Sequence, residues 1–267
     1  MISLNRFEMK KNAALAIEAF AILRDKVSMQ QLSHKMRLVL AGRALRALLT
    51  RVSAYAHIGG YDPRLEDNIR TLNGLVERAQ SSNLSFNVVT PPQSKFTAPS
   101  FTGTTADKPD VLFLLNFTTS QRSALLQSSS TLALLYTPEN EHFGIGPVEG
   151  MICGLPVLAC NSGGPTESIV DQPPEQRTGW LRTPNPDIWA DALEEICRMD
   201  EPERASLAQR AKHRAESVFG MASMANELER LLVETVEMGP VETWPVKGVA
   251  FVFAFLVGLV LAVLSRC

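Results

Sequence analysis

The chain has 267 residues, of which 45% are hydrophobic and 20% charged, and its formal net charge is −2. This balance is typical of a globular protein and excludes a chain that is disordered throughout. A near-neutral charge provides no broad attraction to nucleic acid, so we expect no nucleic-acid partner. The four cysteines form no CxxC pair, which argues against a disulfide framework and a zinc site and favours a reducing compartment.

Apolar runs and helical periodicities alternate along the chain and predict its elements. In the first half of the chain we expect a helix over 12–24, a strand over 37–41, a helix over 64–79, strands over 84–89 and 111–115, and a helix over 120–129. A strand over 131–136, a helix from near Pro147, a strand over 155–160 and a helix after the glycine loop 162–164 should follow. The last expected elements are helices over 187–198, 202–218 and 222–237. This alternation predicts an α/β fold, a single Rossmann-like domain with a parallel sheet. Such sheets bind ligands beyond the carboxyl ends of their strands.

Residues 43–59 interrupt this alternation. Apolar side chains such as Leu45 and Leu49 recur at helical spacing, which favours a surface helix inserted in a loop. Joining Gly42 directly to Gly60 leaves a short strand-to-helix link of ordinary length. Two explanations stay open for the segment, a lineage-specific insertion and a retained intron read in frame.

The C-terminal segment 248–264 is apolar and carries no charge. A membrane-spanning helix needs about 20 such residues, with a range of about 17–25. We expect a hydrophobic membrane helix over 248–265, joined by a linker (237–247) to the domain over 1–236. A buried C-terminal helix is the alternative, and a helix lying on the membrane surface also stays open. No apolar signal-peptide core occurs near the start, which predicts a cytosolic body.

The segment from Tyr136 to Ser168 contains the pattern Gly-Pro-x-Glu twice, starting at Gly146 and at Gly164. Each copy follows an expected strand and is typical of a helix start, with Pro at the first helical position and Glu at the third. The two helix N-termini should lie at one edge of the sheet. Free backbone N–H groups and the positive helix dipole there favour binding of a phosphate.

Four charged residues complete the candidate site. Glu141 and Glu149 form a Glu-x7-Glu pair around the first of these helix starts, so both can point into one cleft. A carboxylate accepts two hydroxyls, which suits a sugar or a ribose diol, although Glu149 can also serve only as a helix cap. Arg6 and Lys11 flank an expected strand-to-helix turn, where cations favour a bound diphosphate; a solvated basic turn is the alternative.

These motifs resemble the C-terminal, nucleotide-sugar-binding half of retaining GT-B glycosyltransferases of family 4. The segments RFEMKKNAALAIEAF, YTPENEHFGIGPVEGM and GLPVLACNSGGPTESIV carry the resemblance, which covers about residues 2–236 without 43–59. Within the family, the match is closest to mannosyltransferases that extend the dolichol-linked precursor of N-glycans. The resemblance implies transfer of mannose from GDP-mannose to a dolichyl-diphosphate oligosaccharide, first in α-1,3 and then in α-1,6 linkage. It also implies location at the endoplasmic reticulum membrane, with the catalytic body on the cytosolic face.

The resemblance further implies a role for each site residue. Glu141 holds hydroxyls of the mannose, Glu149 holds the ribose, and Arg6 and Lys11 neutralise the leaving diphosphate. No metal or other cofactor in the protein is implied. The remaining expected donor contacts are His142, Phe143, Gly144, Ile145 and Gly146.

The chain departs from the family pattern because no acceptor-binding half precedes the matched segment. We therefore expect weak or no transferase activity from this chain alone, and the sequence suggests an incomplete gene model. Two other functions stay open. One is a noncatalytic, membrane-anchored subunit that binds a nucleotide sugar or another dolichol-pathway mannosyltransferase, and the other is a GT-B transferase that uses a UDP-sugar.

Overall fold

The computed structural model describes residues 1–28, 36–42, 45–46, 57–58, 60–90, 99–101, 109–239, 248, 251–257 and 261. The chain divides into two compact units, Met1–Gly220 and Met221–Cys267, and each is described by itself. Most of the expected linker and of the expected membrane helix lies outside the described residues. The proposed bounds at 236 and 247 therefore stay predictions.

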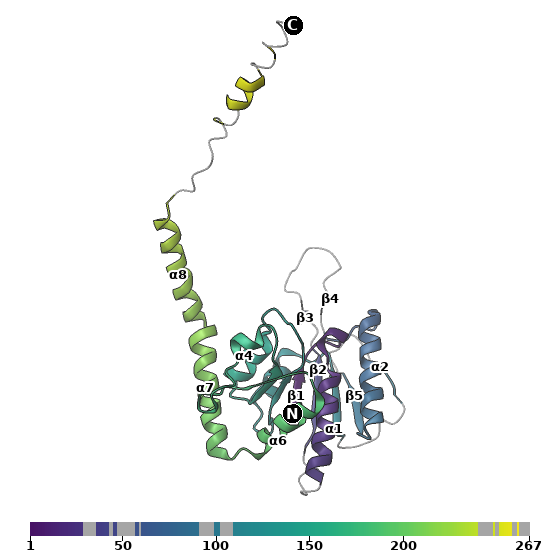
Figure 1. Ribbon diagram of the computed structural model, residues 1–267. Helices are drawn as coiled ribbons and strands as arrows, with labels where there is room; N and C mark the ends of the chain where they lie inside the picture. Colours follow the sequence, from purple (N-terminus) through teal and green to yellow (C-terminus); the bar gives the residue numbers. More distant parts are fainter. Residues whose placement is uncertain are drawn as a thin grey trace. The chain divides into compact units, whose positions relative to one another are not determined.

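The first unit is built on a parallel seven-stranded sheet in the order β5-β6-β2-β1-β7-β8-β9 (Figure 1). This confirms the expected α/β fold with a parallel sheet. The strand bounds are β1 (Ile2–Leu4), β2 (Leu38–Gly42), β5 (Phe86–Val89), β6 (Val111–Leu115), β7 (Leu134–Tyr136), β8 (Val157–Cys160) and β9 (Trp180–Arg182).

Two strands of this sheet for which the sequence analysis gave no bounds, β1 and β9, have three residues each. Apolar runs this short carry too little pattern to be separated from loops. β1 nevertheless lies near the centre of the sheet, where Ile2 is opposite Val39 of β2 on one side and Leu134 of β7 on the other.

Helices cover both faces of the sheet. Successive side chains of a strand point to opposite faces, so the apolar strands have side chains to bury on each side. Leu158 packs into a cluster with Phe20 of α1 and Trp189 of α6, whereas its neighbour Val157 packs into a second cluster with Met151 of α4. The helix bounds in this unit are α1 (Ala14–Ser28), α2 (Glu66–Ser81), α3 (Thr119–Gln127), α4 (Ile145–Ile152), α5 (Pro165–Ser168), α6 (Pro186–Arg198) and α7 (Glu201–Phe219).

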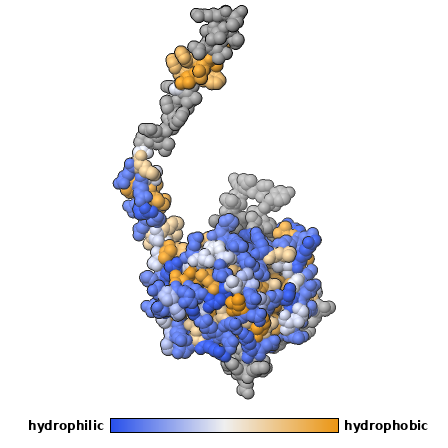
Figure 2. Space-filling view, in the orientation of Figure 1, coloured by the Kyte–Doolittle hydropathy of each residue, from blue (hydrophilic) through white to orange (hydrophobic). Residues whose placement is uncertain are grey.

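In the second unit, α8 (Met221–Glu237) contains no buried residue. Exposed apolar side chains such as Met224, Leu228 and Leu231 recur at helical spacing among charged ones (Figure 2). No helix within the described ranges is long and apolar enough to cross a membrane. The expected membrane helix over 248–265 falls mainly outside those ranges and stays a prediction.

The structure describes only four residues of the interrupting segment 43–59. Leu45–Arg46 (β3) and His57–Ile58 (β4) pair as an antiparallel ladder. The expected surface helix is therefore wrong at these positions. At Leu45–Arg46 and His57–Ile58, pairing between the two short strands satisfies the backbone N–H and C=O groups that a helix would otherwise satisfy. The rest of the segment lies outside the described residues.

Candidate functional site

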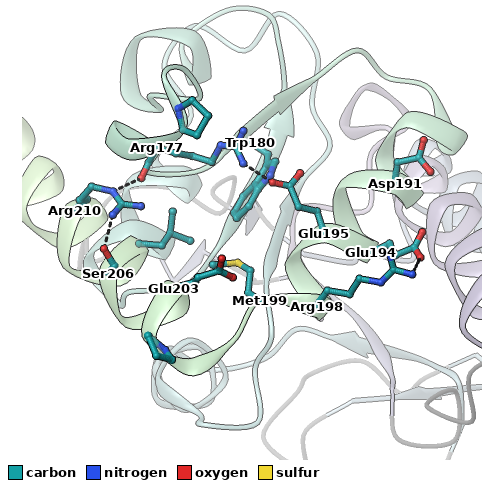
Figure 3. A pocket seen from close by; sticks show the side chains of 13 residues that line it. Arg177, Trp180, Asp191, Glu194, Glu195, Arg198, Met199, Glu203, Ser206 and Arg210 are labelled. Carbon is teal, nitrogen blue, oxygen red and sulfur yellow. Dashed lines mark hydrogen bonds and ion pairs between the residues drawn. The ribbon is translucent and has the colours of Figure 1, made fainter.

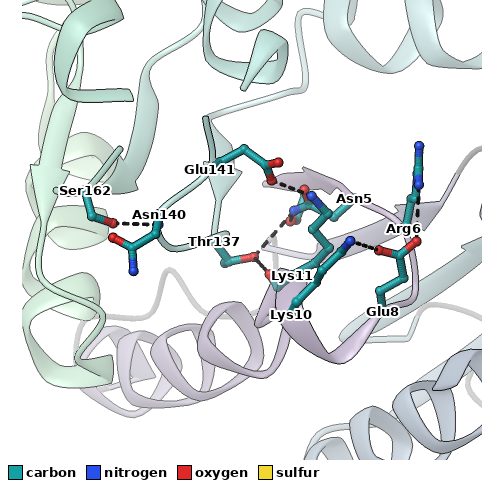
Figure 4. A network of polar contacts seen from close by, with 10 residues as sticks. Asn5, Arg6, Glu8, Lys10, Lys11, Thr137, Asn140, Glu141 and Ser162 are labelled. Carbon is teal, nitrogen blue, oxygen red and sulfur yellow. Dashed lines mark hydrogen bonds and ion pairs between the residues drawn. The ribbon is translucent and has the colours of Figure 1, made fainter. Parts of the chain in front are cut away.

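The strand order reverses between β1 and β7, which makes their carboxyl ends a topological switch point. The connection through α1 leads from β1 to β2, and the connection through α4 leads in the opposite direction, from β7 to β8. Open α/β sheets bind ligands in the crevice at such a point. Lys11, which follows β1, and Glu141, which follows β7, form an ion pair there (Figure 4).

Hydrogen bonds join the loops that follow β1 and β7. The Thr137 hydroxyl donates to the Lys11 carbonyl at 2.6 Å and accepts from the Asn5 amide at 3.4 Å. The Asn12 amide donates to the Glu139 carboxylate at 3.0 Å. These bonds cross the switch point and fix the backbone on either side of Lys11; Figure 4 shows the two that Thr137 makes.

The loop after β8 supports Glu141 from the other side. The Gly164 N–H donates to the Glu141 carbonyl at 2.8 Å, and the Ser162 hydroxyl accepts from the Asn140 N–H at 3.0 Å. A β-carbon on Gly163 would lie 2.3 Å from the Glu141 carbonyl oxygen. The loop therefore approaches so closely that glycine is required there, which agrees with the close approach read from the sequence.

The Tyr136 hydroxyl forms a hydrogen bond with the Glu141 side chain. Burial first, and then the negative charge and hydrogen bond of Glu141, raise the pKa of the Tyr136 hydroxyl. The hydroxyl is therefore a neutral donor to that carboxylate at physiological pH. A β-carbon on Gly144 would meet the Tyr136 hydroxyl oxygen at 2.6 Å, and one on Gly146 would meet the ring at 3.0 Å. These two glycines leave room for the tyrosine.

The second carboxylate, Glu149, is held separately. It forms a two-pronged ion pair with Arg122 of α3, and both side chains are partly buried. One sequence prediction is wrong here. Ile145 is the first residue of α4, so Pro147 occupies the third helical position and Glu149 the fifth. Gly144 takes the left-handed backbone conformation and acts as the cap, which starts the helix earlier than the Gly-Pro pattern implied.

At the second copy of the pattern, the prediction is confirmed. Pro165 is the first residue of α5 and Glu167 lies in its first turn. Both α4 and α5 begin beyond the carboxyl ends of adjacent parallel strands, β7 and β8. The two helix N-termini therefore share one edge of the sheet, as expected.

The other predicted residues lie at the same edge, and those with described side-chain contacts make them to residues other than Lys11 and Glu141. Arg6 is half-exposed and pairs with Glu8 at 3.3 Å. His142 is exposed, and Phe143 packs edge-on against Phe219 with ring centroids 5.6 Å apart. Ile145 is 64% exposed, so its side chain is available to a ligand rather than to the core.

Sequence reasoning missed Arg122, Tyr136 and the amide and hydroxyl groups that connect the loops. A polar residue directly after a buried strand is a signal for Thr137 and Asn5, since each follows β7 or β1. Arg122 carried no such signal, because it meets Glu149 only through an ion pair between two helices that are separate in sequence.

A depression of about 820 Å³ lies elsewhere, between the last turns of α6 and the first turns of α7 (Figure 3). Arg177 stacks over Trp180 with the guanidinium carbon 5.2 Å from the ring centroid, and it also pairs with Glu195. Since α6 runs back from the carboxyl edge, this depression lies toward the opposite edge of the sheet. Within the described ranges, no group of three or more His, Cys, Asp or Glu residues is arranged to hold a metal ion.

Comparison with known proteins gives a consistent family. Residues 106–214 match the family described as "Glycosyl transferases group 1". The chain is 34% identical over 236 residues to Alpha-1,3/1,6-mannosyltransferase ALG2 of Rhizomucor pusillus, covering 88% of this chain and 45% of that protein. It is 37% identical over 235 residues to Alpha-1,3/1,6-mannosyltransferase alg-2 of Neurospora crassa, covering 87% of this chain and 43% of that protein. The chain therefore spans about half the length of the curated relatives it matches.

Solved structures show the same fold. The sucrose-phosphate synthase of Thermosynechococcus elongatus superposes with a TM-score of 0.59 at 20% identity, over 89% of this chain and 46% of that chain. The C-terminal domain of a glycosyl transferase group 1 family protein from Francisella tularensis superposes with a TM-score of 0.53 at 18% identity, over 82% of this chain and 86% of that chain. Over most of its length this chain is thus similar to about half of an α-1,3/1,6-mannosyltransferase, and its residues 106–214 match the group 1 glycosyl transferase family.

Proposed function

We propose that this chain is the donor-binding half of a retaining α-1,3/1,6-mannosyltransferase and binds GDP-mannose beyond the carboxyl ends of β1 and β7. The observation that carries the proposal is the ion pair between Lys11 and Glu141 at the topological switch point. It places a cation and a hydroxyl acceptor together where this class of sheet binds ligands. Mannose is proposed as the transferred sugar because the names of the curated relatives describe mannosyltransferases.

The chemistry divides among the charged groups. Transfer breaks the bond between the mannose anomeric carbon and the phosphate oxygen, so negative charge develops on the departing diphosphate. Lys11, with Arg6 on the same loop, neutralises that charge, and the N-terminus of α4 adds backbone N–H groups. Glu141 accepts hydroxyls of the mannose, and Glu149 accepts those of the ribose. No metal is assigned to the reaction.

The acceptor and the location are part of the same proposal. The acceptor is a dolichyl-diphosphate oligosaccharide, which receives mannose in α-1,3 and then α-1,6 linkage at the cytosolic face of the endoplasmic reticulum membrane. Other dolichol-pathway mannosyltransferases are candidate partners. Because the chain spans about half of its relatives, we propose weak or no transfer by this chain alone.

Isothermal titration of the full chain with GDP, GDP-mannose and UDP-glucose tests the donor. We expect saturable binding of both guanine nucleotides at one site and weaker binding of UDP-glucose. Binding of UDP-glucose equal to or tighter than that of GDP-mannose would favour the UDP-sugar transferase, and no binding of any nucleotide would refute a donor site. Adding the dolichyl-diphosphate acceptor and measuring transfer separates a transferase from a noncatalytic subunit.

A further inference from the structure

We propose that Arg122 is a positioning residue that fixes the Glu149 carboxylate for the ribose diol of the donor nucleotide, an inference that rests on the proposed function. Arg122 comes from α3 and Glu149 from α4, so the pair links two helices that each begin beyond a strand carboxyl end. One terminal nitrogen of Arg122 donates to each carboxylate oxygen of Glu149. This two-pronged geometry fixes the plane of the carboxylate, which a single contact does not.

The backbone at Arg122 is fixed by hydrogen bonds in the first turn of α3. The Thr118 hydroxyl accepts from the Gln121 N–H at 3.2 Å, and the Gln121 side chain accepts from the Thr118 N–H at 2.9 Å. This capping box fixes the first turn of α3, and the Arg122 N–H donates to the Thr118 carbonyl at 3.0 Å. Arg122 is only 19% exposed and Glu149 only 25%. A partly buried, two-pronged pair whose arginine lies on a capped helix is more ordered than a surface ion pair.

The pairing leaves Glu149 able to accept a ribose hydroxyl. An ionised carboxylate has about four lone-pair sites on its two oxygens, and the guanidinium occupies one site on each. The site that remains on each oxygen points outward, to opposite sides of the carboxylate, so a hydroxyl of the ribose diol can bind there without displacing Arg122. Arg122 also stops the carboxylate from rotating. The guanidinium therefore orients Glu149 without occupying its remaining acceptor sites.

A direct contact between Arg122 and the phosphates is the competing interpretation. The two can be separated by probes that lack one half of the nucleotide. Inorganic pyrophosphate carries the anionic group without a ribose, and 2′,3′-dideoxy-GDP carries the base and the phosphates without the diol. A positioning role predicts that only ligands with the diol respond to Arg122.

The experiment is a titration of the full chain, wild type and variants, with GDP, 2′,3′-dideoxy-GDP and pyrophosphate. In Arg122→Met, we expect GDP to bind about tenfold more weakly, the order of one hydrogen bond to a charged group. Dideoxy-GDP and pyrophosphate should bind as to wild type. Arg122→Lys keeps the charge with a single contact and should show an intermediate loss for GDP alone. Adding Arg122→Met to Glu149→Gln should cost nothing further.

Arg70→Met is the matched control, since Arg70 also pairs with a glutamate of a neighbouring turn but is exposed at the surface of α2. It should leave all three affinities unchanged. Additive effects of Arg122→Met and Glu149→Gln, or an equal loss for pyrophosphate, would overturn the positioning role while leaving donor binding intact. Failure of wild type to bind GDP would instead refute the donor site itself, and the inference with it.

Discussion

Gly164→Ala is expected to lower the free energy of unfolding by about 3 kcal/mol and to weaken donor binding together with it. A β-carbon on Gly164 would lie 2.2 Å from the Phe143 carbonyl oxygen and 2.3 Å from its α-carbon. Both are backbone atoms, which cannot rotate away, so the loop after β7 has to shift. Overpacking of this kind costs about 1–3 kcal/mol or somewhat more. The same shift breaks the 2.8 Å bond from the Gly164 N–H to the Glu141 carbonyl.

Gly74→Ala is the matched control. Gly74 lies on the exposed side of α2, and a β-carbon there would meet nothing within 4 Å. Alanine should therefore stabilise the chain by about 0.5–1 kcal/mol, because glycine loses more backbone entropy in a helix. Urea unfolding measures both variants. Equal stability of Gly164→Ala and wild type would show that the loops do not approach as closely as described.

Lys11→Met is expected to weaken GDP binding by about 10–100-fold, since a hydrogen bond to a charged group contributes about 1.5–3 kcal/mol. Lys11 is the cation of the switch-point pair and its side chain is only 15% exposed. The substitution also removes the partner of Glu141. A rise in salt concentration should weaken GDP binding to wild type more than to the variant, because the variant has one fewer charge for the salt to screen.

Lys10→Met tests whether position or charge alone matters. Lys10 is the neighbouring lysine, but its side chain is 72% exposed and pairs with Glu8 at 3.3 Å. Surface pairs of this kind contribute little, so GDP affinity should change less than twofold. Equal losses for Lys10→Met and Lys11→Met in the same titration would mean that the basic turn attracts anions generally. A specific site at the switch point would then be refuted.

Much of the fold follows from the sequence because most strands are buried on both faces and appear as continuous apolar runs. The run Val111–Leu115, for example, is β6 with the bounds expected. The central strand β1 has only three residues, and its place depends on pairing with β2 and β7 rather than on its own pattern. Tertiary pairing of this kind cannot be found from local periodicity.

The candidate site was predictable to a similar degree. Glu141, Lys11 and the close glycine loop could be predicted because their spacing relative to the strands places them at one edge. The start of α4 was misplaced because Pro147 suits the first helical position, whereas Gly144 in the left-handed conformation begins the helix earlier. The partner of Glu149 depends on where the fold places α3 relative to α4, and no motif within either helix specifies Arg122.

The central claim is that the carboxyl ends of β1 and β7 bind a guanosine-diphosphate sugar. A crystal structure of the chain with GDP-mannose tests it most directly. We predict the diphosphate beside Lys11 and the N-terminus of α4, the mannose at Glu141, and the ribose at Glu149. Donor density in the depression between α6 and α7, or no density at all under saturating donor, would contradict the account.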